Sequence, residues 1–137
     1  MIDVVHIPTK DVPRAWLTLG AFVDKAAGRY SRDYDLETMR GAIFDGKAAL
    51  FGVFKDGEPM AAVVTSEIVY PKRKVMLIEL IGGNNVREWI QQLFEQMVNI
   101  AKRAGYAAIE AKARAGWSKV IKSCKLRQAY IAYELEI

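Results

Sequence analysis

Residues Lys74–Lys112 decide the fold of this chain, and they read KVMLIELIGGNNVREWIQQLFEQMVNIAKRAGYAAIEAK. The apolar run Val75–Ile81 predicts a buried strand, and a turn follows at Gly82–Asn85. Apolar residues then recur every three or four positions from Val86 to Ala104, which predicts a long helix with one apolar face. A second short strand is predicted at Ala107–Ala111. A strand, a helix and a strand in this order indicate a βαβ unit, so we expect the two strands to be adjacent and parallel with a right-handed crossover.

Both ends of the predicted helix carry recognisable signals. Asn85 is suited to cap the helix, and Glu88 three residues later is suited to complete a capping box. Lys102 and Arg103 lie in the last predicted turn, where a positive charge favours the helix dipole. Gly105 then supplies the residue that can adopt the left-handed conformation of a helix stop.

Composition indicates one ordinary globular domain over residues 1–137, with a formal net charge of +4. No apolar run approaches the roughly twenty residues that span a bilayer, and the first residues do not resemble a signal peptide. The single cysteine, Cys124, excludes an internal disulfide and fits a reducing cytoplasm. With His6 as the only histidine, we expect no metal site.

The rest of the chain divides into short elements, which give the order β-α-α-β-β-β-α-β-α-β. This order predicts an α+β fold with a mixed, mostly antiparallel sheet and a central parallel pair. The further predicted elements are a strand at Val4–Ile7, a helix opening at Asp11, a helix at Leu36–Phe44 capped by Asp35, strands at Ala48–Phe54 and Met60–Tyr70 around an Asp56-Gly57 turn, a helix at Ser118–Cys124 and a last strand at Gln128–Leu135.

Five short motifs lie on these elements in a consistent order. They are Thr65 to Tyr70-Pro71 in a hairpin, Gly82-Gly83 after the fourth strand, Trp89 in the next helix, Ala101–Gly105 at its end, and Arg114-Ala115-Gly116-Trp117 after the fifth strand. Along essentially its whole length the chain resembles the GNAT superfamily of N-acetyltransferases, an α/β/α fold. The motifs are most similar to short GNAT-like proteins of tailed phages and prophages.

The resemblance implies an acetyl-CoA site where the fourth and fifth strands separate. Backbone N–H groups of the turn and the helix N-terminus would bind the pyrophosphate. The residues implied in binding the cofactor are Leu80, Ile81, Gly82, Gly83, Asn84, Asn85, Val86, Arg87 and Arg114. The turn departs from the family pattern because it is shorter and lacks a leading Gln or Arg. Gly82-Gly83 therefore either admits the phosphates or only permits a tight turn between strand and helix.

Amine acetylation needs a base for the ammonium group and an acid for the leaving thiolate. Glu79 is the candidate base, since it is the one carboxylate in an apolar strand and burial would raise its pKa. The alternatives are that Glu79 faces solvent or pairs with a lysine, or that Glu67 is the base. The tyrosine that often serves as the acid in the family is replaced by Ile121, which leaves Tyr130, or else Tyr133 on the last strand, as the candidate acid.

Two functions follow from the resemblance. The first is an N-acetyltransferase that moves an acetyl group from acetyl-CoA to an amine on a small molecule or protein, encoded by a phage or prophage. The second is a catalytically lapsed GNAT-fold phage protein that binds a protein partner as a virion, assembly or host-interaction factor. We expect a cytoplasmic location for an enzyme, with the virion as the alternative, and an oligomer stays open. The scattered basic residues argue against nucleic acid as a partner, and nothing indicates a membrane.

Overall fold

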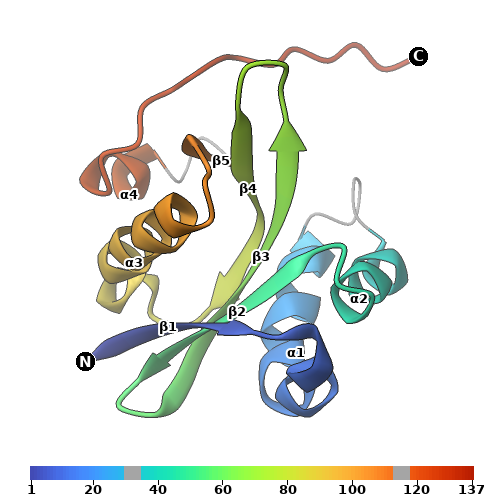
Figure 1. Ribbon diagram of the computed structural model, residues 1–137, viewed down its shortest axis with the longest axis vertical. Helices are drawn as coiled ribbons and strands as arrows, with labels where there is room; N and C mark the ends of the chain where they lie inside the picture. The colour runs from blue at the N-terminus through green and yellow to red at the C-terminus, as the bar shows by residue number, and fades with distance from the viewer. Residues whose placement is uncertain (30–34, 113–117) are drawn as a thin grey trace.

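The computed structural model describes residues 1–29, 35–112 and 118–137. It is a five-stranded sheet between two layers of helices (Figure 1). The strands, in spatial as well as chain order, are β1 Ile2–Ile7, β2 Ala49–Lys55, β3 Glu58–Val69, β4 Lys74–Gly83 and β5 Ala108–Ala111. The helices are α1 Val12–Arg29 and α2 Leu36–Phe44 on one face, and α3 Ile90–Arg103 and α4 Ser118–Ser123 on the other.

The βαβ unit predicted from the sequence is confirmed. β4 pairs with β5 in parallel, from Val75 opposite Ala108 to Ile78 opposite Ala111, and α3 connects the two strands. All other neighbouring strands are antiparallel. The α+β class and the mixed, mostly antiparallel sheet are therefore as predicted, but among the described strands the parallel pair lies at one edge of the sheet and not at its centre.

Each face of the sheet buries its own hydrophobic core, as period-2 strands between amphipathic helices require. Trp89, Leu93 and Met97 dominate the α3-side core and are fully buried against β3 and β4. On the opposite face, Leu19 of α1 and Ile43 of α2 dominate the α1-side core. The described residues contain no helix that is long and apolar enough to cross a membrane.

Three predicted turns form as their sequences indicate. Asp56 and Gly57 have φ angles of 50° and 83°, which is the left-handed pair expected at a two-residue hairpin. Gly46 and Gly105 have φ angles of 79° and 85° just beyond α2 and α3. Glycine is favoured at these positions because a Cβ atom destabilises left-handed backbone.

The predicted capping box at the start of the long helix is wrong. Asn85 has φ 55° and makes no side-chain cap, the next three residues form a 3-10 turn, Val86–Glu88, and the α-helix begins only at Ile90. The reason is Trp89, whose fully buried ring donates a hydrogen bond from Nε1 to the carbonyl oxygen of Asn84 at 2.6 Å. This bond holds Trp89 at φ −131°, outside the helical range, so the regular helix starts after it.

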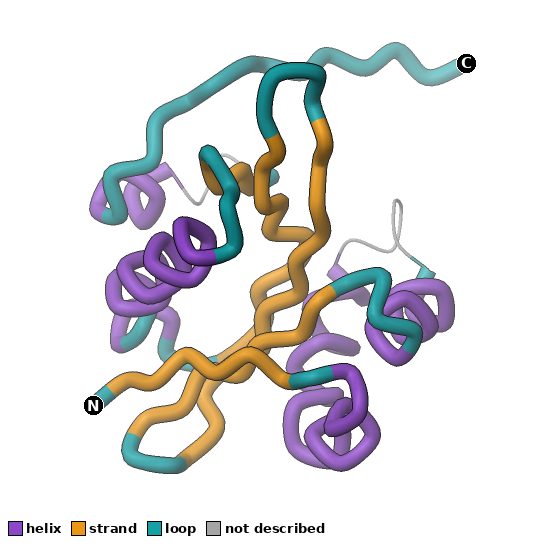
Figure 2. Tube along the Cα trace, in the orientation of Figure 1, coloured by secondary structure: helices purple, strands orange, loops and turns teal. Residues whose placement is uncertain are grey.

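The predicted last strand, Gln128–Leu135, does not form in the single chain. Residues 126–137 have no regular structure, and they run past the tip of the β3–β4 hairpin and away from the sheet (Figures 1 and 2). The side chains of Tyr133 and Leu135 are each 90% exposed. Residues with strand propensity form a strand only beside a sheet edge that offers hydrogen bonds. This tail does not pair with the β5 edge of its own chain, so it forms no strand.

Candidate functional site

Pairing between the two parallel strands covers only the first half of β4. It ends at Ile78 opposite Ala111, the last residue of β5, whereas β4 continues through residues 79–83. Residues 80–83 are paired with β3 alone, within the part of the chain that the structure describes. Strand backbone that is unpaired on one side can hydrogen-bond an extended ligand.

Glu79 is the extra residue of a β-bulge in β4. Opposite it, the register with β3 shifts, because Val64 pairs with Leu80 whereas Thr65 pairs with Ile78. The bulge reverses the order in which side chains of β4 point to the two faces of the sheet. As a result, Ile78 packs in the α3-side core and Leu80 packs in the α1-side core. A regular strand would put those two side chains on one face. Bulges re-aim side chains and are frequent beside active sites.

The carboxylate of Glu79 is held in place from the neighbouring strand. The hydroxyl of Ser66 on β3 donates a hydrogen bond of 2.7 Å to Oε1 of Glu79, and the contact is partly buried. A serine donor fixes the direction of one carboxylate oxygen. Sequence reasoning missed Ser66 because its meeting with Glu79, thirteen positions away in the chain, depends on the shifted register.

Glu67, the alternative base, belongs to different surroundings. It pairs with Lys74 at 3.7 Å and stands opposite Met76, whose side chain lies in the α3-side core. Ser66 and Glu67 are consecutive in β3, so their side chains point to opposite faces of the sheet. Glu67 is therefore on the other face from the Glu79–Ser66 pair.

The two glycines, expected in the turn, are instead the last residues of β4. Gly82 and Gly83 pair with Ala62 and Ala61 of β3, and neither has a positive φ. A Cβ atom built on Gly82 would lie 2.2 Å from the carbonyl oxygen of Phe22 in α1, and one built on Gly83 would lie 2.4 Å from the Cβ of Ala61. Close packing of helix and strand thus accounts for both glycines.

The turn itself offers a small set of backbone donors. The N–H of Asn84 is already bonded to the carbonyl oxygen of Met60 at 3.1 Å. By contrast, the N–H groups of Asn85, Val86 and Arg87 make no backbone hydrogen bond among the described residues. Three consecutive N–H groups before a helix, with the cation of Arg87 among them, are suited to an anion.

Leu80 and Ile81 complete the exposed stretch of β4 backbone. Leu80 is buried in the α1-side core, while Ile81 is partly buried against the α3-side core. Their side chains therefore pack in the cores, and only their backbone N–H and C=O groups could bind a ligand.

Tyr130 lies at the hairpin tip, where it interacts electrostatically with Tyr70. The hydroxyl of Tyr70 is 3.2 Å from both carboxylate oxygens of Glu110 on β5. Desolvation, and next the Glu110 hydrogen bond, raise the pKa of Tyr70 above its usual range. Tyr70 is four residues along β3 from Ser66, a rise of roughly 13 Å. The structure thus groups Tyr130 with Tyr70 and Glu110 and not with Glu79.

Arg114 lies outside the described residues, as do Gly116 and Trp117. Among the residues that are described, no three His, Cys, Asp or Glu side chains gather in a way that could hold a metal ion.

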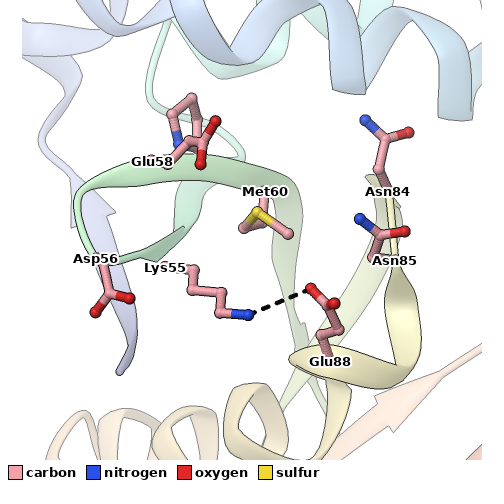
Figure 3. A pocket seen from close by; sticks show the side chains of 8 residues that line it. Lys55, Asp56, Glu58, Met60, Asn84, Asn85 and Glu88 are labelled. Carbon is pink, nitrogen blue, oxygen red and sulfur yellow. Dashed lines mark ion pairs between the residues drawn. The ribbon is translucent and has the colours of Figure 1, made fainter.

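A hollow of about 450 Å³ lies between the β2–β3 hairpin and the turn after β4. Lys55 and Glu88 point toward one another across it and form an ion pair at 3.6 Å (Figure 3). Asp56 and Glu58 also line the hollow, so its charged groups are three carboxylates and one ammonium. This charge disfavours phosphate groups. The hollow also lies on the β3 side of β4, opposite the side where β5 separates.

Solved structures match this chain over its whole length. A ribosomal-protein-alanine N-acetyltransferase from Brucella melitensis biovar Abortus 2308 superposes with a TM-score of 0.71 at 13% identity, covering 100% of this chain and 99% of that one. The chain has the GNAT fold. No protein-family model matches the sequence, and no curated protein does so either.

Two further matching structures were solved with ligands bound. A predicted acetyltransferase from Clostridium acetobutylicum was solved with acetyl-CoA and has a TM-score of 0.66 at 12% identity, covering 99% of this chain and 96% of that one. An aminoglycoside acetyltransferase from an uncultured soil metagenomic sample was solved with sisomicin and has a TM-score of 0.64 at 12% identity, covering 98% and 97%. At these identities the likeness is one of fold.

Proposed function

We propose that this GNAT-fold chain is an N-acetyltransferase that transfers the acetyl group of acetyl-CoA to an amine on a small molecule or protein. The observation that carries the proposal is the placement of Glu79. It is the bulge residue of β4, it is hydrogen-bonded to Ser66, and it stands where β4 first extends beyond β5. A general base is needed at the point where an acyl group and an amine meet, and bulges are frequent beside active sites.

The chain offers acetyl-CoA two kinds of contact. The N–H groups of Asn85, Val86 and Arg87 suit the pyrophosphate, and the β4 backbone at residues 79–83 suits the extended pantetheine arm. When bound, acetyl-CoA supplies an acetyl group activated as a thioester. Solved neighbours with acetyl-CoA and with sisomicin support this ligand and an amine acceptor.

Glu79 then has one chemical task. Its carboxylate accepts a proton from the ammonium form of the acceptor, so that the nitrogen lone pair is free to form the new C–N bond. The C–S bond breaks, the nitrogen releases its second proton to solvent to give the amide, and the thiolate takes up a proton. Ser66 keeps Oε1 of Glu79 oriented through its 2.7 Å hydrogen bond, so it is a positioning residue. We assign the proton donor for the thiolate to Tyr130, which requires the tail to move from its place beside Tyr70.

Glu79→Gln tests the proposal with Glu67→Gln as its matched control. Loss of a general base lowers turnover by roughly 10²- to 10⁴-fold, while the affinity for acetyl-CoA should be unchanged. Glu67→Gln removes the carboxylate of the residue that follows Ser66 in β3 and points to the opposite face of the sheet, so turnover should stay near that of the wild type. Assays of thiol release over a panel of primary amines measure both. Equal effects of the two substitutions would contradict the role of Glu79.

The binding step is tested separately by thermal unfolding with acetyl-CoA. A ligand at about 100 times its Kd stabilises the native state by roughly 2.7 kcal/mol, which corresponds to a rise in Tm of about 9 °C for a chain of this size. An unmoved Tm at millimolar acetyl-CoA would refute acetyl-CoA as the ligand.

The alternative function is a protein-binding GNAT-fold chain without catalysis, as a phage assembly, virion or host-interaction factor. One observation favours it: Gly82 and Gly83, which the resemblance assigned to the cofactor, are fully explained by packing against α1 and β3. This alternative predicts no acetyl-CoA binding, so the same thermal measurement distinguishes the two functions. The resemblance to short phage and prophage proteins supports a phage origin in either case.

A further inference from the structure

The tail after α4 has the sequence pattern of a strand, but its large apolar side chains are exposed. From Ala129 to Ile137 the odd positions are all apolar, and the even positions change from Tyr130 and Ala132 to Glu134 and Glu136. The strict alternation from Tyr133 to Ile137 is the pattern of a strand with one buried face. In the single chain that apolar face is exposed, with Tyr133 and Leu135 both at 90%. A contiguous exposed apolar stripe of this kind marks an interaction surface.

The two edges of the sheet differ in how they are protected. Gln96 of α3 closes the β1 edge: its Nε2 donates to the carbonyl oxygen of Ile2 at 2.7 Å, and its Oε1 accepts from the N–H of Val4 at 2.9 Å. The opposite edge, β5, has no strand or side chain bonded to its outer backbone among the described residues. An unprotected strand edge is a template for another strand.

The surroundings of β5 suit the tail. The side chains of Tyr106, Ile109 and Ala111 are partly buried on the α3 side of this edge and offer apolar contact. The basic residues near the edge are exposed, and they are Lys102 and Arg103 in the last turn of α3 and Lys112 just after β5. The tail brings Glu134 and Glu136, so the charges of tail and edge are opposite.

The tail forms no strand beside the β5 edge of its own chain. Leu126 packs against the α3-side core, and four residues later Tyr130 is already beside Tyr70 at the hairpin tip. Residues 131–137, which include the alternating segment from Tyr133 to Ile137, follow that point and extend beyond the domain (Figure 1). A second copy offers the same open edge to this segment, and the exchange is reciprocal in a twofold dimer.

We propose that residues 128–137 of each copy add as a strand to the β5 edge of a second copy, forming a symmetric dimer. Main-chain hydrogen bonds to β5 hold the segment, and its odd-numbered side chains cover the apolar rim beside that edge. The proposal rests on neither Glu79 nor the turn after β4. Because the segment contains Tyr130, the assigned proton donor, its tests measure assembly and not turnover.

Sedimentation equilibrium of the full chain tests the proposal with two substitutions of equal chemistry. Leu17 on α1 and Leu135 in the tail are 89% and 90% exposed in the single chain. If the isolated chain were the whole structure, Leu17→Glu and Leu135→Glu would be equally harmless. We expect the wild type to be a dimer of 15.4-kDa chains. Leu17→Glu should leave its Kd unchanged, and Leu135→Glu should raise that Kd on the order of 100-fold, because leucine is lost from two equivalent contacts.

Hydrogen exchange separates pairing between copies from pairing within one chain. Amides of residues 129–137 should be protected at protein concentrations above the dimer Kd and should exchange freely below it. Protection that does not change with concentration would overturn the proposal in favour of a strand added to the chain's own β5. A wild type that is monomeric at several hundred micromolar, or a dimer weakened equally by both substitutions, would also overturn it.

Discussion

Gly82→Ala distinguishes a glycine needed for packing from one needed for a ligand. The new Cβ would lie 2.2 Å from the carbonyl oxygen of Phe22 and 2.8 Å from the Cβ of Ala26, both on α1. A backbone oxygen cannot rotate away, so α1 has to shift by about 1 Å to restore an ordinary contact. Overpacking of this kind costs typically 1–3 kcal/mol. For 137 residues, that loss lowers Tm by roughly 3–10 °C.

Thermal and urea unfolding followed by circular dichroism measure this loss, with Gly41→Ala as the control. Gly41 lies inside α2, and a Cβ built there meets nothing within 4 Å. Alanine at that position should stabilise the chain by about 0.5–1 kcal/mol, because glycine is a poor helix former. If Gly82→Ala left Tm unchanged and abolished acetyl-CoA binding instead, the packing explanation of this glycine would be refuted.

Two further predictions concern the sheet margins. Gln96→Ala should lower the free energy of unfolding by about 1–2 kcal/mol, since it removes both hydrogen bonds to the β1 edge. The control Gln92→Ala, on the exposed side of α3, should leave the free energy of unfolding almost unchanged. Tyr70 should titrate above the usual tyrosine range, in absorbance at 295 nm compared with Tyr70→Phe, and Glu110→Gln should lower its pKa. Because the folded-state pKa is raised, the stability from this group is fully present below the unfolded pKa near 10 and is lost as pH rises through the folded value.

The βαβ unit was predictable because local signals and tertiary packing agree there. The period of the apolar residues from Val86 to Ala104 identifies the face of α3 that the structure buries, including Leu93 and Met97. Gly105 marks the end of that helix through its own backbone preference. Such signals lie within one element, so they survive without knowledge of the fold.

The start of α3 was mispredicted because a tertiary contact overrides a local signal. Asn85 and Glu88 have the spacing of a capping box, yet burial of Trp89 and its bond to Asn84 set the backbone instead. Burying a tryptophan side chain contributes more than the roughly 1 kcal/mol of a typical cap. The contact of Trp89 is therefore kept, and the cap at Asn85 does not form.

The last strand shows the opposite limit of sequence reasoning. Its residues have the composition and alternation of a strand, yet the single chain leaves them exposed. Strand propensity describes a fit to a pleated, half-buried surface, and the sequence does not say which chain supplies that surface. In the proposed dimer, the pattern would predict the right conformation, and the edge that the single chain does not offer would come from a second copy.

The position of Glu79 was predictable from a local signal, but its contact with Ser66 was not. The sequence singles it out as the one carboxylate in an apolar strand, but the residue that holds it, Ser66, becomes its neighbour only through a register shift between β3 and β4. A shift of one residue changes which side chains share a face, and no local pattern encodes it. The same shift puts Leu80 into the α1-side core, so the bulge is stabilised by hydrophobic burial. Packing thus secures the backbone irregularity that presents the carboxylate, so we expect Glu79→Gln to keep the fold.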